Sequence, residues 1–153
     1  MIIQSLHHIT LLVEDVARAE RFYGGILGLE PIARFDARFP GLFYRCGAQE
    51  IHLIVSSRPL ERSTLYLNLD GGGETHRRYV HRHLALVVSD WAEMQRRLRD
   101  GAVRIEFSEE TIDPGDGFGL NLVKGWKSRY GRVPLFCTDP FDNLLELIPA
   151  AGA

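Results

Sequence analysis

The sequence predicts an α+β fold made of two modules that share the element order βαβββ. The first observation is composition: the 153 residues are 45% hydrophobic and 25% charged, as in a globular domain with one core. The second is an internal repeat, because residues 8–23 and 83–98 align with each other. The third is a series of short apolar runs between turn residues after each copy of the repeat, and such runs indicate strands.

Each copy of the repeat predicts a strand followed by a helix. Both copies begin with an apolar, β-branched run, HITLLV and HLALVV, which is typical of a strand. Asp15 and Asp90 come next, and an aspartate side chain can cap a helix N-terminus. Apolar residues then recur every three to four positions, as in a helix. Glycines are expected to end these helices, at Gly24–Gly25 and then Gly28 in the first half and at Gly101 in the second.

The remaining strands are expected at the other short apolar runs. In chain order these runs are 31–35, 41–46, 49–56, 103–107, a stretch within 120–126, 132–138 and 143–149. Turns at 46–48 and 139–142 separate the last two strands of each half, as hairpin loops do. Residues 64–69 could add one more strand.

These elements divide the chain into a first module at 1–57, a linker at 58–80 and a second module at 81–153, which together form a single domain. The second module is about 19 residues longer between corresponding positions, and the extra residues are placed in 108–132. This glycine-rich insertion is either a surface loop without a chemical role or a loop that covers a substrate.

Charge and patterning exclude several functional classes. The net charge of −2 argues against a nucleic-acid-binding protein. No apolar stretch approaches the ~20 residues of a membrane span, and the N-terminus has no signal-peptide pattern. The two cysteines, Cys46 and Cys137, are too few for a disulfide scaffold. A soluble cytoplasmic protein is therefore expected.

Polar side chains recur at four corresponding positions of the repeat. His8 and His83 begin the first strand of each half, while His52 and Glu146 lie among aliphatic residues in the last strand. Strand alternation places each of them on the face opposite its aliphatic neighbours. Because the helix of each module needs an apolar face to pack on, all four are expected on the other face of the sheet.

Imidazoles and a carboxylate form a suitable donor set for a divalent cation such as Zn, Ni, Mn or Fe(II). A carboxylate among aliphatic residues is costly to bury unless it is paired or bound to a metal. A single strand histidine is more often a core residue, and a single glutamate is more often an edge charge. Their repetition at equivalent positions favours a metal site. His7, His76 and His81 are expected to have no such role, and His7 is expected to face the other way.

On these residues the chain resembles the vicinal oxygen chelate superfamily of glyoxalases, bleomycin resistance proteins and extradiol dioxygenases. The resemblance spans residues 5–149 and is carried by LHHITL, RFY, LGL, RHLA with Asp90, and DPFDNLLEL. The last segment is close to the family ending DP-x-G-N-x-x-E-L, with Asp142 where glycine is usual. This is a mild departure, because aspartate tolerates a left-handed backbone better than most residues.

The resemblance implies a curved mixed sheet around a cleft with the metal at its floor. The family's ligands correspond to His8, His83 and Glu146, and its fourth position is occupied by His52. The cleft is formed within one chain or across two, and a homodimer is common in the family. The implied function is a glyoxalase-like lyase or isomerase that acts on a small substrate with adjacent oxygens, with Glu146 as the base.

Three other functions remain open. One is Fe(II)-dependent extradiol ring cleavage, which uses two histidines and one carboxylate. Another is thiol transfer to an epoxide antibiotic, in which cationic residues grip a phosphonate, and the candidates are Lys124, Lys127, Arg129 and Tyr130. The last is a bleomycin-type drug-binding protein without catalysis.

Overall fold

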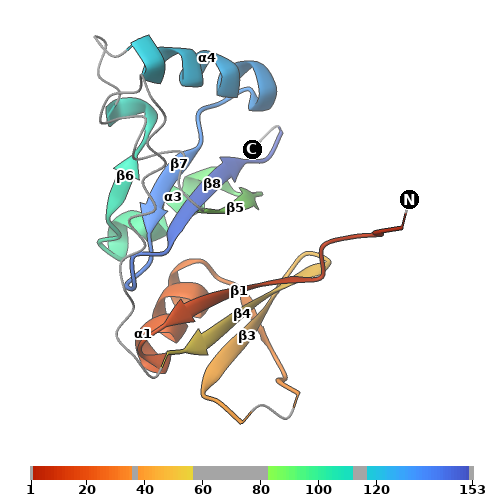
Figure 1. Ribbon diagram of the computed structural model, residues 1–153. Helices are drawn as coiled ribbons and strands as arrows, with labels where there is room; N and C mark the ends of the chain where they lie inside the picture. The colour runs from red at the N-terminus through yellow and green to blue at the C-terminus, as the bar shows by residue number, and fades with distance from the viewer. Residues whose placement is uncertain (1, 36–37, 57–82, 112–116, 152–153) are drawn as a thin grey trace. The chain divides into compact units, whose positions relative to one another are not determined.

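The structure is a computed structural model that describes residues 2–35, 38–56, 83–111 and 117–151, with only the backbone described for 117–120. The chain divides into two compact units, Met1–Arg62 and Ser63–Ala153, each with its own four-stranded sheet (Figure 1). The whole predicted linker, 58–80, and the additional strand considered at 64–69 within it lie outside the described residues.

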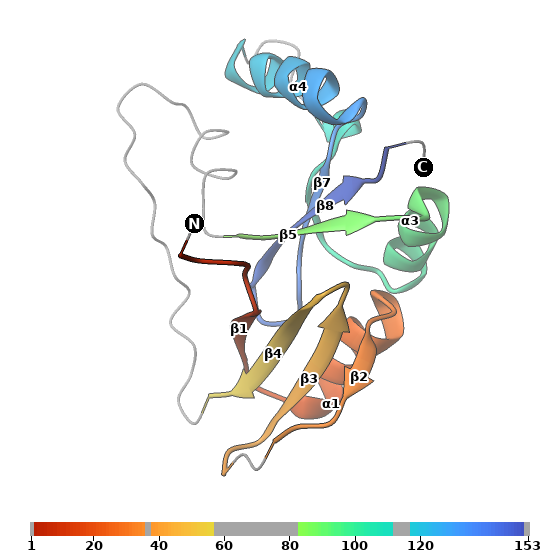
Figure 2. The same cartoon turned by 90° about the vertical axis from the view of Figure 1, so that its right-hand side faces the viewer.

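The first unit has the predicted βαβββ order. Its elements are β1 (His8–Val13), α1 (Val16–Glu20), the π-helical turn η1 (Arg21–Ile26), β2 (Glu30–Ile32), β3 (Gly41–Cys46) and β4 (Gln49–Val55). The sheet order is β1-β4-β3-β2, as Figure 2 shows, with β1 parallel to β4 and the other pairs antiparallel.

The second unit repeats this arrangement. Its elements are β5 (His83–Val88), α3 (Trp91–Asp100), β6 (Ile105–Phe107), the 3-10 turn η2 (Glu109–Thr111), α4 (Gly117–Tyr130), β7 (Leu135–Thr138) and β8 (Leu144–Pro149). The order β5-β8-β7-β6 has β5 parallel to β8 and the other pairs antiparallel. The predicted α+β class and the repeated module are confirmed, and both sheets are open rather than closed into barrels.

The predicted N-terminal caps are confirmed. The Asp15 carboxylate accepts a hydrogen bond from the backbone N–H of Arg18 at 2.6 Å, and the Asp90 carboxylate accepts one from Glu93 at 3.0 Å. Each aspartate satisfies one of the backbone donors that a helix start leaves without an intrahelical partner. The corresponding aspartates therefore begin corresponding helices in the two units.

The glycine stop signals are only partly correct. Gly101 is the C-cap of α3, and Gly28, with φ 71°, follows the end of η1. Gly24 and Gly25, in contrast, lie inside η1 and do not end the helix. A Cβ at Gly24 would lie 3.4 Å from the hydroxyl oxygen of Tyr44, so this glycine leaves room for a packed side chain instead.

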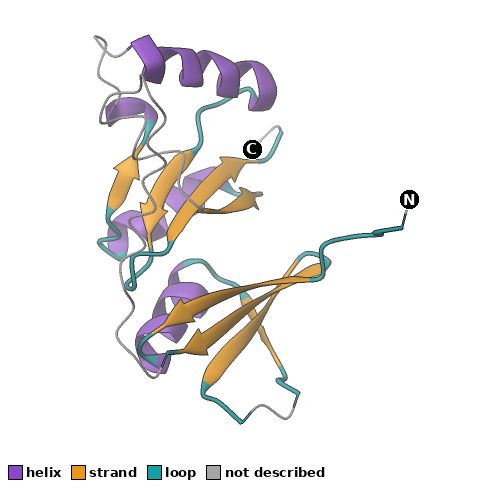
Figure 3. Ribbon diagram, in the orientation of Figure 1, coloured by secondary structure: helices purple, strands orange, loops and turns teal. Residues whose placement is uncertain are grey.

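The strand predicted within 120–126 is wrong, because the segment lies in α4 (Figure 3). Two of its apolar residues, Val123 and Trp126, are three positions apart and so lie on one side of a helix. They pack against a cluster of buried residues that includes Phe107 and Phe136. The insertion at 108–132 is thus largely helical in its described part.

Several strands are also shorter than predicted, and β7 begins only after Pro134, which lacks a backbone donor.

Opposite faces of the first unit's sheet have different roles. In the first unit Tyr44 and Ile51 pair across β3 and β4, and Tyr44 stacks on Tyr23 of η1 with ring centroids 6.3 Å apart. These three side chains are buried on the helix-covered face. His52, the next residue after Ile51, therefore lies on the other face, as predicted.

Within the described residues, none of the helices combines the length and the apolar character needed to cross a membrane.

Candidate metal centre

The first unit brings together the two histidines predicted within it. Thr10 of β1 is the register partner of His52 in β4, and His8 lies two residues earlier on the same face. The His8 and His52 rings are stacked, with centroids 4.3 Å apart and planes 12° from parallel. His8 is exposed, whereas His52 is buried.

A carboxylate outside the predicted site residues holds His52. Nε2 of His52 lies 2.7 Å from a carboxylate oxygen of Glu50, two residues earlier on the same strand face. This hydrogen bond is the main reason that the pKa of Glu50 lies below its ordinary value, although partial desolvation opposes it. A histidine that donates one ring N–H to a carboxylate offers its other nitrogen as a metal ligand. The sequence did contain a signal for Glu50: it precedes His52 by two residues in the same strand, so the two side chains lie on the same face.

His7 differs from its prediction. It lies just before β1, where strand alternation no longer fixes its direction. Its Nδ1 atom is 3.0 Å from Nδ1 of His8, so one ring donates a hydrogen bond to the other. The rings meet edge to face, with centroids 5.2 Å apart. His7 therefore contacts a site residue rather than facing away from it.

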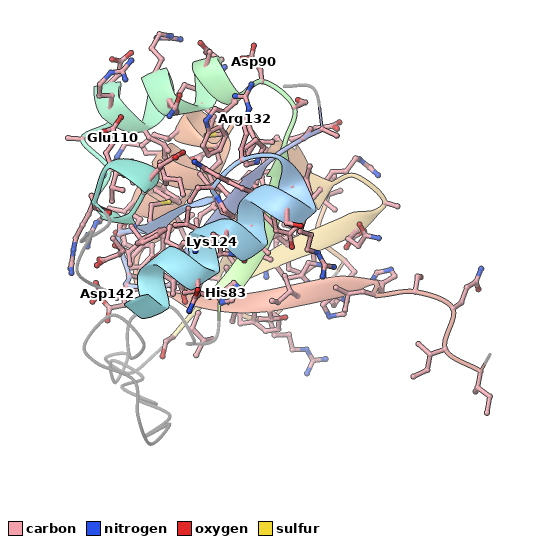
Figure 4. The ribbon with its side chains drawn as sticks, turned by 90° about the horizontal axis from the view of Figure 1, so that it is seen from above. His83, Asp90, Glu110, Lys124, Arg132 and Asp142 are labelled. Carbon is pink, nitrogen blue, oxygen red and sulfur yellow. The ribbon has the colours of Figure 1, made fainter. Side chains whose placement is uncertain are left out.

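The second unit pairs the other two predicted residues. Ala85 of β5 is the register partner of Glu146 in β8, so His83 lies two residues earlier on the same face. Nε2 of His83 is 2.9 Å from a Glu146 carboxylate oxygen. Only 7% of Glu146 is exposed. The His83 imidazole therefore gives this buried carboxylate a polar partner in an otherwise apolar strand. Figure 4 labels His83 together with Lys124 of α4.

The donor set fits a divalent cation. A cation bonded to two ligand atoms at about 2.0–2.2 Å holds those atoms roughly 3 Å apart, and the Glu146 and His83 atoms already have this spacing. The four predicted ligands are divided two and two between the units. Within the described residues, no group of three or more histidine, cysteine or acidic side chains gathers as a metal cluster. The convergence of all four residues stays a prediction.

The cationic residues of the insertion have local partners. Lys127 forms an ion pair with Glu109. The Arg129 guanidinium lies 5.5 Å from the centroid of the Tyr130 ring. Lys124 is exposed on α4. Two of the three cations considered for phosphonate binding are therefore held within their own segment.

Comparison with known families identifies the chain. Residues 5–147 match the family model described as the glyoxalase/bleomycin resistance protein/dioxygenase superfamily. The chain belongs to this superfamily. Membership confirms the resemblance inferred from the repeated strand-helix segments and the DPFDNLLEL ending. A search of curated proteins finds no match.

Several solved structures are similar to this chain and support the fold. A glyoxalase family protein from Bacillus anthracis is 18% identical, with 98% of each chain covered and a TM-score of 0.64. A mutant of the fosfomycin resistance protein FosX from Listeria monocytogenes, in complex with Mn(II) and 1S,2S-dihydroxypropylphosphonic acid, is 17% identical. This match covers 97% of the present chain and 94% of that chain, with a TM-score of 0.64. FosX from Mesorhizobium loti is 15% identical over 96% and 92% of the chains, with a TM-score of 0.61.

Proposed function

We propose that this superfamily member is a divalent-metal-dependent enzyme of the glyoxalase type, a lyase or isomerase acting on a small substrate with two adjacent oxygens. The observation that carries the proposal is the buried Glu146 carboxylate paired with His83 at 2.9 Å. Burying a carboxylate in an apolar strand costs several kcal/mol, so a functional reason for retaining it is expected. A metal ligand that also moves a proton provides such a reason.

In this proposal His8, His83 and Glu146 hold the cation, and His52 is the fourth ligand. Glu50 supports that role by accepting the Nε2 proton of His52. When bound, the cation supplies Lewis-acid stabilisation of negative charge on the substrate oxygens. Glu146 accepts a proton from the substrate, and the apolar neighbours that limit its exposure also keep bulk water from that carboxylate. Zn, Ni, Mn and Fe(II) are all compatible with these ligands.

Opening of an epoxide is the second candidate. It is favoured by the similarity to FosX, because the Listeria protein is in complex with Mn(II) and 1S,2S-dihydroxypropylphosphonic acid, a diol with oxygens on adjacent carbons. Of the residues considered for the phosphonate grip, Lys127 would have to give up its ion pair with Glu109, whereas Arg129 already lies beside Tyr130. Extradiol cleavage remains compatible with two histidines and a carboxylate. A bleomycin-type binding protein would not need the metal ligands.

Metal content followed by a turnover screen tests these functions. The protein is purified without chelators, its metal is quantified, and the metal-reconstituted protein is offered a hemithioacetal, a catechol and an epoxide with a thiol or water. We expect close to one divalent ion per chain and turnover of the hemithioacetal. Turnover of only the catechol or the epoxide would assign the alternative reaction. A protein that binds no divalent metal would contradict the metal-dependent enzyme.

A homodimer belongs to the same proposal. β1 and β5 lie at the edges of their described sheets, and an exposed strand edge favours pairing with another strand. Light scattering should give a mass of about 35 kDa, twice the 17.3 kDa chain. A monomer at micromolar concentration would rule out a stable site between chains.

The free cysteines Cys46 and Cys137 are compatible with the cytoplasmic location that we also propose.

A further inference from the structure

We propose that Phe43 and Phe136 are positioning residues that set the ring orientation of the site histidines, His52 in the first unit and His83 in the second. The effect of this positioning on metal binding rests on the proposed function. The orientation of the rings in the metal-free protein does not. Three features support the positioning role: the register of the two sheets, the ring geometry and the residues behind each phenylalanine.

Phe43 stacks directly on His52. The two residues are register partners across β3 and β4, so their side chains share the face that carries His8. Their ring centroids are 3.6 Å apart and their planes only 2° from parallel. With His8 stacked at 4.3 Å as well, the His52 imidazole has two parallel ring neighbours. This contact and the bond to Glu50 together restrict rotation of His52.

Phe136 has the corresponding position in the second unit. It is the register partner of Glu146 across β7 and β8, as Phe43 is of His52. The His83 ring meets the Phe136 ring edge to face, with centroids 5.6 Å apart and planes at 75°. Edge-to-face contact is a favoured geometry for aromatic pairs. Phe136 thus lies against both members of the pair formed by His83 and Glu146.

Further side chains pack against each phenylalanine and restrict its movement. The Arg34 guanidinium lies 5.6 Å from the Phe43 ring centroid, and it donates hydrogen bonds to the carbonyl oxygens of Gly41 and Phe39. In the second unit, Trp126 of α4 meets Phe136 with ring centroids 5.8 Å apart. Phe107 contacts both of these rings, at 6.1 Å from Phe136 and 5.4 Å from Trp126. Both phenylalanines are almost fully buried, at 4% and 1% exposure.

In the first unit, the contact between Phe43 and His52 lies away from the core on the helix-covered face, whereas Phe136 of the second unit belongs to a buried hydrophobic cluster and also contacts His83. In the first unit the helix-covered face has its own buried aromatic pair, Tyr23 and Tyr44. Phe43 is on the opposite face, with the histidines. Replacing a residue that orients a metal ligand typically weakens metal binding 10–100-fold. This is the size of effect expected for a lost phenylalanine contact.

The test uses the full-length variants Phe43→Leu and Phe136→Leu. Their controls are Tyr44→Phe and Cys137→Ala, each of which alters the buried residue next to the phenylalanine, on the opposite face of the same strand. Histidine ring signals are recorded by NMR in the metal-free proteins. Co(II) affinity, the visible Co(II) spectrum and urea unfolding are then measured.

We expect Phe43→Leu to move the ring ¹⁵N signals of His52 towards a mixture of the two tautomers, because an imidazole that is free to turn loses its fixed contact with Glu50, and Phe136→Leu to do the same for His83 and its contact with Glu146. Co(II) should bind 10–100-fold more weakly with an altered spectrum, whereas the controls keep the wild-type affinity and spectrum. Unchanged histidine signals in both leucine variants, or equal loss of affinity in the controls, would overturn the positioning role. Should wild type bind no Co(II), the proposed function fails, and the metal-free signals still decide this inference.

Discussion

The substitution Glu146→Gln should remove most of the bound divalent metal and abolish turnover while leaving the fold intact. Glutamine keeps the shape of the side chain and an oxygen that can accept from His83, but it loses the anionic charge that holds a cation. Without metal, the variant should be as stable as wild type or about 1 kcal/mol more stable, because a charge is removed from an apolar strand. Metal analysis, turnover and urea unfolding measure the three effects.

His83→Ala provides the complementary test, because its effect on stability has the opposite sign. It should also weaken metal binding, but it leaves the buried Glu146 without its imidazole partner. The metal-free protein should therefore lose about 1–3 kcal/mol. Glu93→Gln is the matched control, since Glu93 is a carboxylate in the same unit that pairs with Arg96 and Arg97 on α3. Equal metal content in wild type, Glu146→Gln and His83→Ala would contradict the enzyme and favour a drug-binding protein.

Much of the arrangement within each unit could be predicted because strand alternation is a local property. The apolar positions of the first strand indicated which face the helix covers, and Ile51 and His52 follow this rule in β4. The register shows why the repeat was informative. His52 opposes Thr10 and Glu146 opposes Ala85, each two residues after the histidine that begins the parallel partner strand. The same backbone pairing therefore brings a histidine close to a second polar residue in both units.

The errors arise where contacts between distant segments decide the structure. Nothing near Val123 and Trp126 in the sequence shows that they pack with Phe107 and Phe136, so the short apolar run resembled a strand. His7 contacts His8 because it precedes β1, and the sequence did not locate that boundary sharply. Boundaries of this kind depend on which backbone groups find partners in the sheet.

A second large effect is expected at the turn that leads into β8. Asp139 is buried, and one of its carboxylate oxygens accepts hydrogen bonds from the backbone N–H groups of Phe141 and Asn143, both at 2.8 Å. The other oxygen accepts from the Asn143 side chain at 2.7 Å. These bonds shape the loop between Thr138 and Leu144, and the loop sets the pairing of Phe136 with Glu146.

Asp139→Ala should therefore destabilise the protein by about 2–6 kcal/mol in urea unfolding, because two backbone donors lose their acceptor, at roughly 1–3 kcal/mol each. The substitution Asp142→Gly in the same turn should instead raise the free energy of unfolding. Asp142 has φ 64°, a left-handed conformation that costs most non-glycine residues roughly 1–2 kcal/mol and aspartate less. Glycine removes this smaller cost but adds flexibility to the unfolded chain, so we expect a net gain of no more than about 0.5 kcal/mol. A loss of less than about 0.5 kcal/mol in Asp139→Ala would show that water replaces the carboxylate, and the turn would then not determine where Glu146 lies.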